Sequence, residues 1–233
     1  MSAAAGIERT MAGLRVGGLV PLTSIDFPGR LAAVVFCQGC PWQCGYCHNP
    51  HLIPPQGPPA MAWDDVLSFL AQRRGLLDGV VFSGGEPTLQ AALPDAIRAV
   101  RQLGFQVALH TAGMYPDRLS AVLPQLDWIG FDIKAPAHAY EAVTNTPGSA
   151  ARVMASLDRM LASGVPYECR TTWDPALFDE PALLALAGML KARGVRHWSL
   201  QVCNRAGQPV NWPAGVARRL AEAFPELVLR VPE

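Results

Sequence analysis

The sequence predicts an α/β fold in which six parallel strands alternate with helices and form a partial, open barrel. Short apolar runs recur along the 233 residues, and most are followed by an amphipathic segment. This alternation is typical of parallel strands joined by right-handed crossovers. Six β/α units are fewer than the eight of a closed barrel. A closed barrel and a doubly wound sheet remain the alternatives.

The strands are predicted from apolar runs bounded by turn residues or charges. Residues 14–30 are expected to form a short strand, a turn and an approach loop, with the turn at Asp26-Phe27-Pro28-Gly29. The run at 31–36 is apolar throughout, as in a strand buried on both faces. The remaining strands are expected at 79–83, 105–111, 128–134, 167–172 and 197–202, with a final strand at 227–231.

Helices are predicted between these strands. The first has Asp64 and Asp65 in its first turn, where carboxylates favour the helix dipole. Glycines that can end helices follow three of the others. The predicted helices cover 63–74, 90–103, 116–123, 149–163, 181–193 and 213–223. Prolines make residues 51–60 an irregular connection.

Composition limits the class of protein. The length fits a single domain over 1–233, with residues 1–12 a flexible terminus that lacks the apolar segment of a secretory signal. Half of the residues are hydrophobic and the net charge is zero, so a large core is expected and nucleic acid is not an expected partner. No apolar run reaches the roughly 18 residues of a membrane span. Clustered cysteines favour a reducing cytoplasm.

Polar residues gather at the carboxyl ends of the predicted strands, where β/α barrels build their sites. Each strand contributes a different group, and agreement among independent loops is stronger evidence than any single motif. These groups are the cysteine loop after 31–36, Gly84-Gly85-Glu86-Pro87, His110-Thr111, Asp132 with Lys134, Arg170, and Gln201 with Asn204 and Arg205.

Three cysteines in the loop after residues 31–36 have the spacing C-x3-C-x2-C: Cys40, Cys44 and Cys47. Thiolates this close together can share one soft metal centre. A structural zinc site needs four protein ligands, which here would require Cys37 or His48. A 4Fe–4S cluster held by three cysteines instead keeps one iron open for another ligand, which suggests chemistry at the cluster.

This motif, with Tyr46 just before its last cysteine, resembles the radical S-adenosylmethionine (SAM) signature. The longer stretches at 23–30 and 36–50 resemble the activases of glycyl-radical enzymes, and most closely those of anaerobic ribonucleoside-triphosphate reductase. The resemblance extends in patches from about residue 14 to about residue 205. It implies the same partial barrel, a 4Fe–4S cluster, and SAM bound at the open iron.

The resemblance also implies an activity. The cluster reductively cleaves SAM, and the resulting radical takes a hydrogen atom from a glycine of a partner enzyme. It implies anaerobic ribonucleotide reductase as that partner and flavodoxin or ferredoxin as the electron donor. A pyruvate formate-lyase activase, a radical SAM enzyme that acts on a small molecule such as a deazapurine precursor, and a non-catalytic iron–sulfur or zinc module are the alternatives.

Several residues are expected to bind SAM. The resemblance implies that Gly84-Gly85-Glu86 holds the amino group, and paired glycines allow close backbone approach. It implies that Tyr46 packs over the cluster, with a merely structural ring as the alternative. Thr111-Ala112-Gly113 resembles the family's Thr-Asn-Gly.

Asp132-Ile133-Lys134 resembles the family's Asp-Leu-Lys. Alternation puts Asp132 and Lys134 on one strand face, and Lys134 is one of only two lysines. We assign Lys134 to the SAM carboxylate and Asp132 to its positioning, with a mutual ion pair as the alternative. Arg170 is a candidate for SAM or the substrate peptide, or else for an ion pair with Glu168 or Asp174.

The remaining candidates are assigned simpler roles. Cys37 is expected to be a buried apolar residue, and Cys169 and Cys203 core or rim residues. His48 either hydrogen-bonds near the cluster or caps its loop. His110 stands where related activases often have an acidic residue, which puts any cation contact there in doubt. A core histidine and a functional one are the two alternatives.

Overall fold

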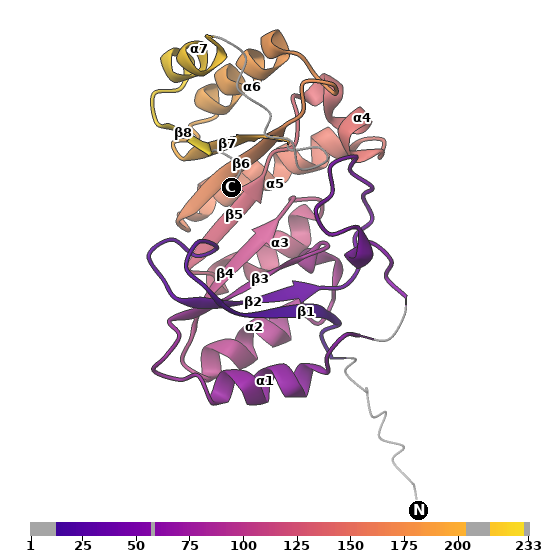
Figure 1. Cartoon of the computed structure of the whole chain (residues 1–233), viewed down its shortest axis with the longest axis vertical. Helices are drawn as coiled ribbons and strands as arrows, with labels where there is room; N and C mark the ends of the chain where they lie inside the picture. Colours follow the sequence, from indigo (N-terminus) through magenta and orange to yellow (C-terminus); the bar gives the residue numbers. More distant parts are fainter. Residues whose placement is uncertain (1–12, 57–58, 204–214, 231–233) are drawn as a thin grey trace, which may run out of the picture.

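A computed structural model describes residues 13–56, 59–203 and 215–230. Its strands form one eight-stranded sheet in chain order, which Figure 1 shows running from β1 and β2 to β7 and β8. β1 is antiparallel to β2, and β2 to β8 are parallel. The strands are β1 (Val16–Thr23), β2 (Ala32–Cys37), β3 (Gly79–Gly84), β4 (Gln106–Thr111), β5 (Trp128–Asp132), β6 (Tyr167–Trp173), β7 (Trp198–Val202) and β8 (Leu227–Arg230).

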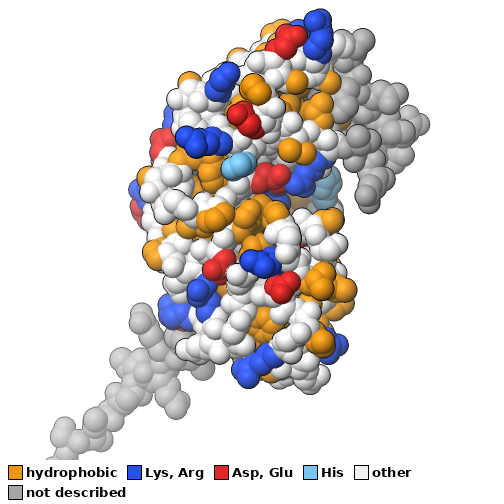
Figure 2. Space-filling model, turned by 90° about the vertical axis from the view of Figure 1, so that its left-hand side faces the viewer, with side chains coloured by type: hydrophobic (Ala, Val, Ile, Leu, Met, Phe, Trp, Pro, Cys, Tyr) orange, Lys and Arg blue, Asp and Glu red, His pale blue; other side chains and the backbone are white. Residues whose placement is uncertain are grey.

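Helices connect the parallel strands and pack along the sheet (Figure 1). The α-helices are α1 (Trp63–Ala71), α2 (Leu93–Gln102), α3 (Pro116–Val122), α4 (Tyr140–Thr144), α5 (Ser149–Ser163), α6 (Glu180–Ala192) and α7 (Val216–Ala223). The described residues also form four single 3-10 turns, which lie in the connections between strands and helices. These are η1 (Pro50–Leu52), η2 (Pro87–Leu89), η3 (Leu123–Gln125) and η4 (Ala137–Ala139). None of the helices in the described segments has both the length and the apolar character needed to cross a bilayer. On the face drawn in Figure 2, Lys and Arg side chains are interspersed with Asp and Glu side chains.

The predicted partial, open barrel is confirmed. The sheet begins at β1 and ends at β8, with no pairing between these two edges among the described residues, so it is not closed. Every predicted strand is present within one or two residues, and 149–163 is helical as predicted. The short α4 and the 3-10 turns were missed. Some predictions concern residues that the structure does not describe, namely 1–12, 213–214 and 231.

Side chains alternate between the two faces of the sheet and so build two cores. The larger core lies between the sheet and the helices and takes Val35, Phe82 and Leu109 from the strands. The smaller core lies on the opposite face and includes Phe27 and Trp128, whose ring centroids are 6.3 Å apart. Phe27 comes from the connection between β1 and β2, so this connection closes one end of the barrel interior.

Strand register brings polar side chains together at the other end of that interior. On β4 and β5, His110 lies opposite Gly130. On β5 and β6, Asp132 lies opposite Arg170. Because side chains of a strand alternate with a period of two, His110, Asp132 and Arg170 share the interior face with the smaller core.

Candidate functional site

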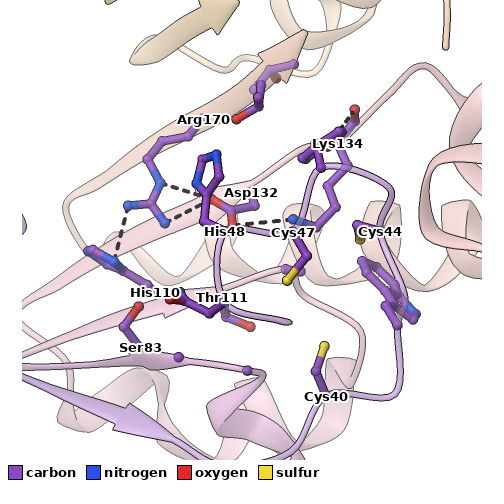
Figure 3. A pocket seen from close by; sticks show the side chains of 18 of the residues that line it. Cys40, Cys44, Cys47, His48, Ser83, His110, Thr111, Asp132, Lys134 and Arg170 are labelled. Carbon is purple, nitrogen blue, oxygen red and sulfur yellow. Dashed lines mark hydrogen bonds and ion pairs between the residues drawn. The ribbon is translucent and has the colours of Figure 1, made fainter. Parts of the chain in front are cut away.

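A cavity of about 510 Å³ lies at the carboxyl ends of the parallel strands. Every strand from β3 to β8 lines it with at least one residue, and the cysteine loop forms another wall (Figure 3). Strand ends and loops that converge in this way are the usual location of a site in β/α barrels. The strand-end groups predicted from the sequence therefore do meet, except that Glu86 and Pro87 do not line the cavity. Asn204 and Arg205 lie outside the described residues.

The three motif cysteines line this cavity from the connection between β2 and η1. Backbone hydrogen bonds pin the loop: the Cys40 amide donates to the Ile53 carbonyl at 3.0 Å, and the Cys47 amide to the Cys44 carbonyl at 3.1 Å. Figure 3 shows the three cysteine side chains at the cavity, with Lys134 beside Cys44 and Cys47. The loop thus holds three half-buried thiols at one open space.

The donor set fits a cluster better than a single ion. In the described ranges, no three His, Cys, Asp or Glu side chains come close enough to hold one metal ion. Cys37, a proposed fourth zinc ligand, is fully buried in the helix-side core and does not line the cavity. A 4Fe–4S cluster needs only one thiolate for each of three irons, so its ligands can stand farther apart than those of zinc.

Before any metal binds, burial favours the protonated form of two of these thiols, Cys40 and Cys44. Burial raises the pKa of Cys40 to about 12 and also raises the pKa of Cys44. Because iron binds the thiolate, loading the site must release these protons.

Gly84 and Gly85 pack against the backbone of the cysteine loop as well as lining the cavity. Gly84 has a φ of +113°, and a Cβ on it would lie 2.4 Å from the Cys37 nitrogen. A Cβ on Gly85 would lie 2.3 Å from the Gly39 carbonyl oxygen. The amides of Gly85 and Glu86 donate to the carbonyls of Cys37 and Gly39, each at 2.9 Å. These glycines therefore fix the loop on the end of β3, a role that the sequence reading missed.

The Glu86 carboxylate is held by hydrogen bonds inside the protein. It is buried and does not line the cavity. It accepts hydrogen bonds from the amide and hydroxyl of Thr88, the hydroxyl of Thr111 and the amide of Ala112, at 2.5–3.0 Å. Burial raises its pKa, and these donors oppose that shift. In this structure Glu86 links the ends of β3 and β4, and only the backbone before it faces the cavity.

Replacing Glu86 by glutamine is expected to destabilise the protein by about 1–3 kcal/mol. One carboxylate oxygen would become an NH2 group that faces donors from Thr88 and Thr111 or from Ala112. Urea denaturation measures the change. Glu222→Gln is the control, because its ion pair with Arg218 is exposed. Equal unfolding midpoints for the two variants would contradict the role given to Glu86.

Asp132, Lys134 and Arg170 form one charged group in the cavity wall (Figure 3). Arg170 Nη2 lies 2.9 Å from Asp132 Oδ1, whereas Lys134 Nζ lies 3.7 Å from Oδ2. Burial works to raise the pKa of Asp132, but Arg170 and Lys134 outweigh it and the pKa is lowered. Asp132 is thus ionised and is paired mainly with Arg170, a partner that replaces the predicted Glu168 or Asp174.

Lys134 has an ammonium group that is nearly enclosed but loosely held. Its side chain is 17% exposed, and Nζ lies 5.8 Å from the centre of the Tyr46 ring. Burial works to lower the pKa of Lys134, but Asp132, Tyr46 and Cys44 raise it overall, so the group stays charged. Within the described residues Nζ makes no hydrogen bond, since 3.7 Å to Asp132 is too long for one. A cation with free donors is suited to an anionic ligand.

Tyr46 and Thr111 support this wall. The Tyr46 hydroxyl donates to the Lys134 carbonyl at 3.4 Å, a long hydrogen bond between the cysteine loop and the segment after β5. The Thr111 hydroxyl donates to Glu86 and accepts from the Gly113 amide at 3.0 Å. Both residues line the cavity.

The other candidates divide between the cavity and the core. Cys169 and Cys203 are buried, as expected, and neither lines the cavity, whereas His48 and Gln201 do. The sequence reading gave no site role to Ile25, Asp26 or Arg230, which also line it. The resemblance over residues 23–30 was the one signal that could have pointed to Ile25 and Asp26.

The sequence model of the radical SAM superfamily matches residues 34–174. A protein of Methanocaldococcus jannaschii, named provisionally as a glycyl-radical enzyme activating enzyme, is 29% identical over 186 residues. That alignment covers 76% of this chain and 75% of the relative.

Two further similarities cover about half of the matching protein. The pyruvate formate-lyase-activating enzyme of Clostridium pasteurianum is 33% identical over 125 residues, which is 52% of either chain. The crystal structure of Streptococcus suis SuiB bound to SAM superposes with a TM-score of 0.61 at 14% identity. It covers 84% of this chain and 48% of SuiB, and at this identity the likeness concerns the fold alone.

Proposed function

This chain belongs to the radical SAM superfamily and is homologous to glycyl-radical-enzyme activating enzymes, and we propose that it installs a glycyl radical on a partner protein. The observation that carries the proposal is one cavity of about 510 Å³ that is lined both by three cysteine thiols and by a charged, loosely held lysine. The thiols can hold a cluster, and the lysine can hold the carboxylate of SAM beside it.

The superfamily uses a 4Fe–4S cluster and SAM, and the residues present fit both. Cys40, Cys44 and Cys47 would bind three irons, and the fourth would be left for SAM. When bound, the cluster and SAM supply the one-electron cleavage of a carbon–sulfur bond and the hydrogen abstraction that this cleavage makes possible. The protein contributes binding, orientation and the exclusion of water.

The cavity wall provides the contacts that orient SAM. The Lys134 ammonium is proposed to bind the carboxylate, with Asp132 behind it. The backbone at Gly84 and Gly85 is proposed to receive the amino group, and the Glu86 carboxylate acts indirectly by holding that segment. Thr111 and Tyr46 complete the enclosure, and Arg170 acts through Asp132.

Anaerobic ribonucleoside-triphosphate reductase is the proposed partner. The support is the resemblance of residues 23–30 and 36–50 to the activases of that enzyme. The identity to a pyruvate formate-lyase-activating enzyme makes pyruvate formate-lyase the second candidate. Flavodoxin or ferredoxin is the proposed electron donor, in the cytoplasm, and the chain is proposed to act as a single radical SAM domain over 1–233.

The first test is electron paramagnetic resonance of the anaerobically reconstituted, reduced protein, with and without SAM. The expected result is a 4Fe–4S signal that shifts when SAM is added, because SAM binds the open iron. Incubation with each candidate partner should then give a glycyl radical on one of them. A resonance signal that is unchanged when SAM is added would contradict the cofactor assignment. A shift without any radical on a partner, but with turnover of a free compound, would indicate a small-molecule substrate.

A further inference from the structure

A chain of polar contacts crosses the interior of the barrel, and the proposed function gives roles to Lys134, Asp132 and Arg170 but none to His110. The chain starts at the Asp26 carbonyl in the connection between β1 and β2. It continues through His110 on β4, Arg170 on β6 and Asp132 on β5. Figure 3 shows His110, Arg170, Asp132 and Lys134 in sequence along one wall of the cavity.

The contacts of His110 define which ring nitrogen carries the proton. Arg170 Nη1 lies 3.2 Å from His110 Nδ1. A guanidinium group can only donate, so Nδ1 must accept. The hydrogen is then on Nε2, which donates to the Asp26 carbonyl at 2.9 Å. Burial and the charge of Arg170 lower the pKa of His110 to about 3, so the ring is neutral near pH 7.

β5 lies between His110 and Arg170, and a glycine on this strand leaves room for their contact. Gly130 lies on β5 opposite His110. A Cβ at Gly130 would lie 2.8 Å from Arg170 Cζ and 2.9 Å from His110 Cδ2. Any other residue there would displace the guanidinium or the imidazole, so the glycine lets the two side chains meet across β5.

The position of Arg170 determines which of the two cations pairs closely with Asp132. Arg170 places Nε at 3.0 Å and Nη2 at 2.9 Å from one oxygen of Asp132. The other oxygen stands 3.7 Å from Lys134 Nζ, beyond hydrogen-bond length. Two cations and one anion leave a net charge of +1, and among the described residues the Lys134 ammonium makes no hydrogen bond. An Arg170 that was not held at its far end could swing away, and Asp132 would then be free to pair with Lys134.

We propose that His110 is a positioning residue for SAM: it holds Arg170 on Asp132 and so keeps the Lys134 ammonium available for the SAM carboxylate. The inference rests on the proposed function only in taking SAM as the ligand, whatever the partner protein is. The competing role is simple packing, since the imidazole also lies edge-on to Trp128 with ring centroids 5.7 Å apart.

The test is the SAM affinity of reconstituted His110→Phe, measured by anaerobic calorimetry. Phenylalanine can keep the contact with Trp128 but can neither accept from Arg170 nor donate to Asp26. The expected result is SAM binding weakened by about tenfold or more, with unchanged iron content. His110→Gln, which has both an acceptor and a donor, should recover most of the affinity. His197→Phe, the same change at an exposed histidine, is the matched control.

A second measurement covers the case in which His110→Phe does not fold. Nitrogen NMR of the oxidised, reconstituted wild-type protein should show His110 with Nε2 protonated and Nδ1 unprotonated from pH 6 to 8. The opposite tautomer, or His110→Phe binding SAM as tightly as wild type, would overturn the inference. Wild-type protein that fails to bind SAM would instead overturn the proposed function, so the two failures are distinguishable.

Discussion

Replacing Cys44 by alanine is expected to abolish the 4Fe–4S cluster and, with it, SAM cleavage. The site offers three thiols, one for each of three irons, so the loss of one leaves an iron without its cysteine ligand. Cys44 is the middle residue of a loop pinned by the Cys40 and Cys47 amides. Two remaining thiolates on this loop cannot hold three irons.

Iron and sulfide analysis after anaerobic reconstitution measures this loss, together with the visible absorption of the cluster. Cys37→Ala is the matched control, because Cys37 is in the same segment but is buried in the helix-side core. It should keep a full cluster and lose only about 1 kcal/mol of stability, the cost of a small cavity. A Cys44→Ala protein with a full cluster, or a Cys37→Ala protein without one, would contradict the ligand assignment.

Replacing Lys134 by alanine is expected to weaken SAM binding by about tenfold to a hundredfold while the cluster remains. A charge-assisted hydrogen bond contributes about 1.5–3 kcal/mol, which corresponds to this range of affinity. The Lys134 side chain is 17% exposed and its ammonium makes no hydrogen bond within the described residues, so its donors are available to the ligand. The cysteines belong to a different segment and should load iron normally.

Anaerobic calorimetry with SAM measures the affinity, and iron content is the internal check. Lys191→Ala is the natural control, since Lys191 is the only other lysine in the chain and is exposed on α6, where it donates to the Ala223 carbonyl. If Lys134→Ala bound SAM as tightly as wild type, the carboxylate would have to be held elsewhere, and the assignment of Lys134 would be wrong.

Much of the fold could be predicted because its signals are local. Apolar runs and the glycines after helices located every strand and the full length of α5. The same local signals missed α4 at Tyr140–Thr144, which at five residues is too short to show helical periodicity. β1 was expected as a strand, but its antiparallel pairing with β2 depends on the connection through residues 24–31, whose path no periodicity encodes.

The composition of the site was more predictable than its contacts. The rule that strand ends converge correctly brought Cys40, Lys134 and Arg170 to one cavity. The partner of Arg170 was wrong because strand register puts Asp132 directly opposite it, and register cannot be read from one strand alone. For the same reason the burial of the Glu86 carboxylate beneath the end of β4 had no sequence signal.

The open seam between β1 and β8 has a topological consequence for what can reach the cavity. A closed ring of strands admits a ligand only along its axis, so a polypeptide would have to present a free end or a narrow bend. In the part of the chain that the structure describes, the first and last strands of the sheet do not pair, so the sheet also offers sideways entry. A loop from the middle of a folded partner, which enters and leaves as two connected strands, could then be laid in from the side without threading.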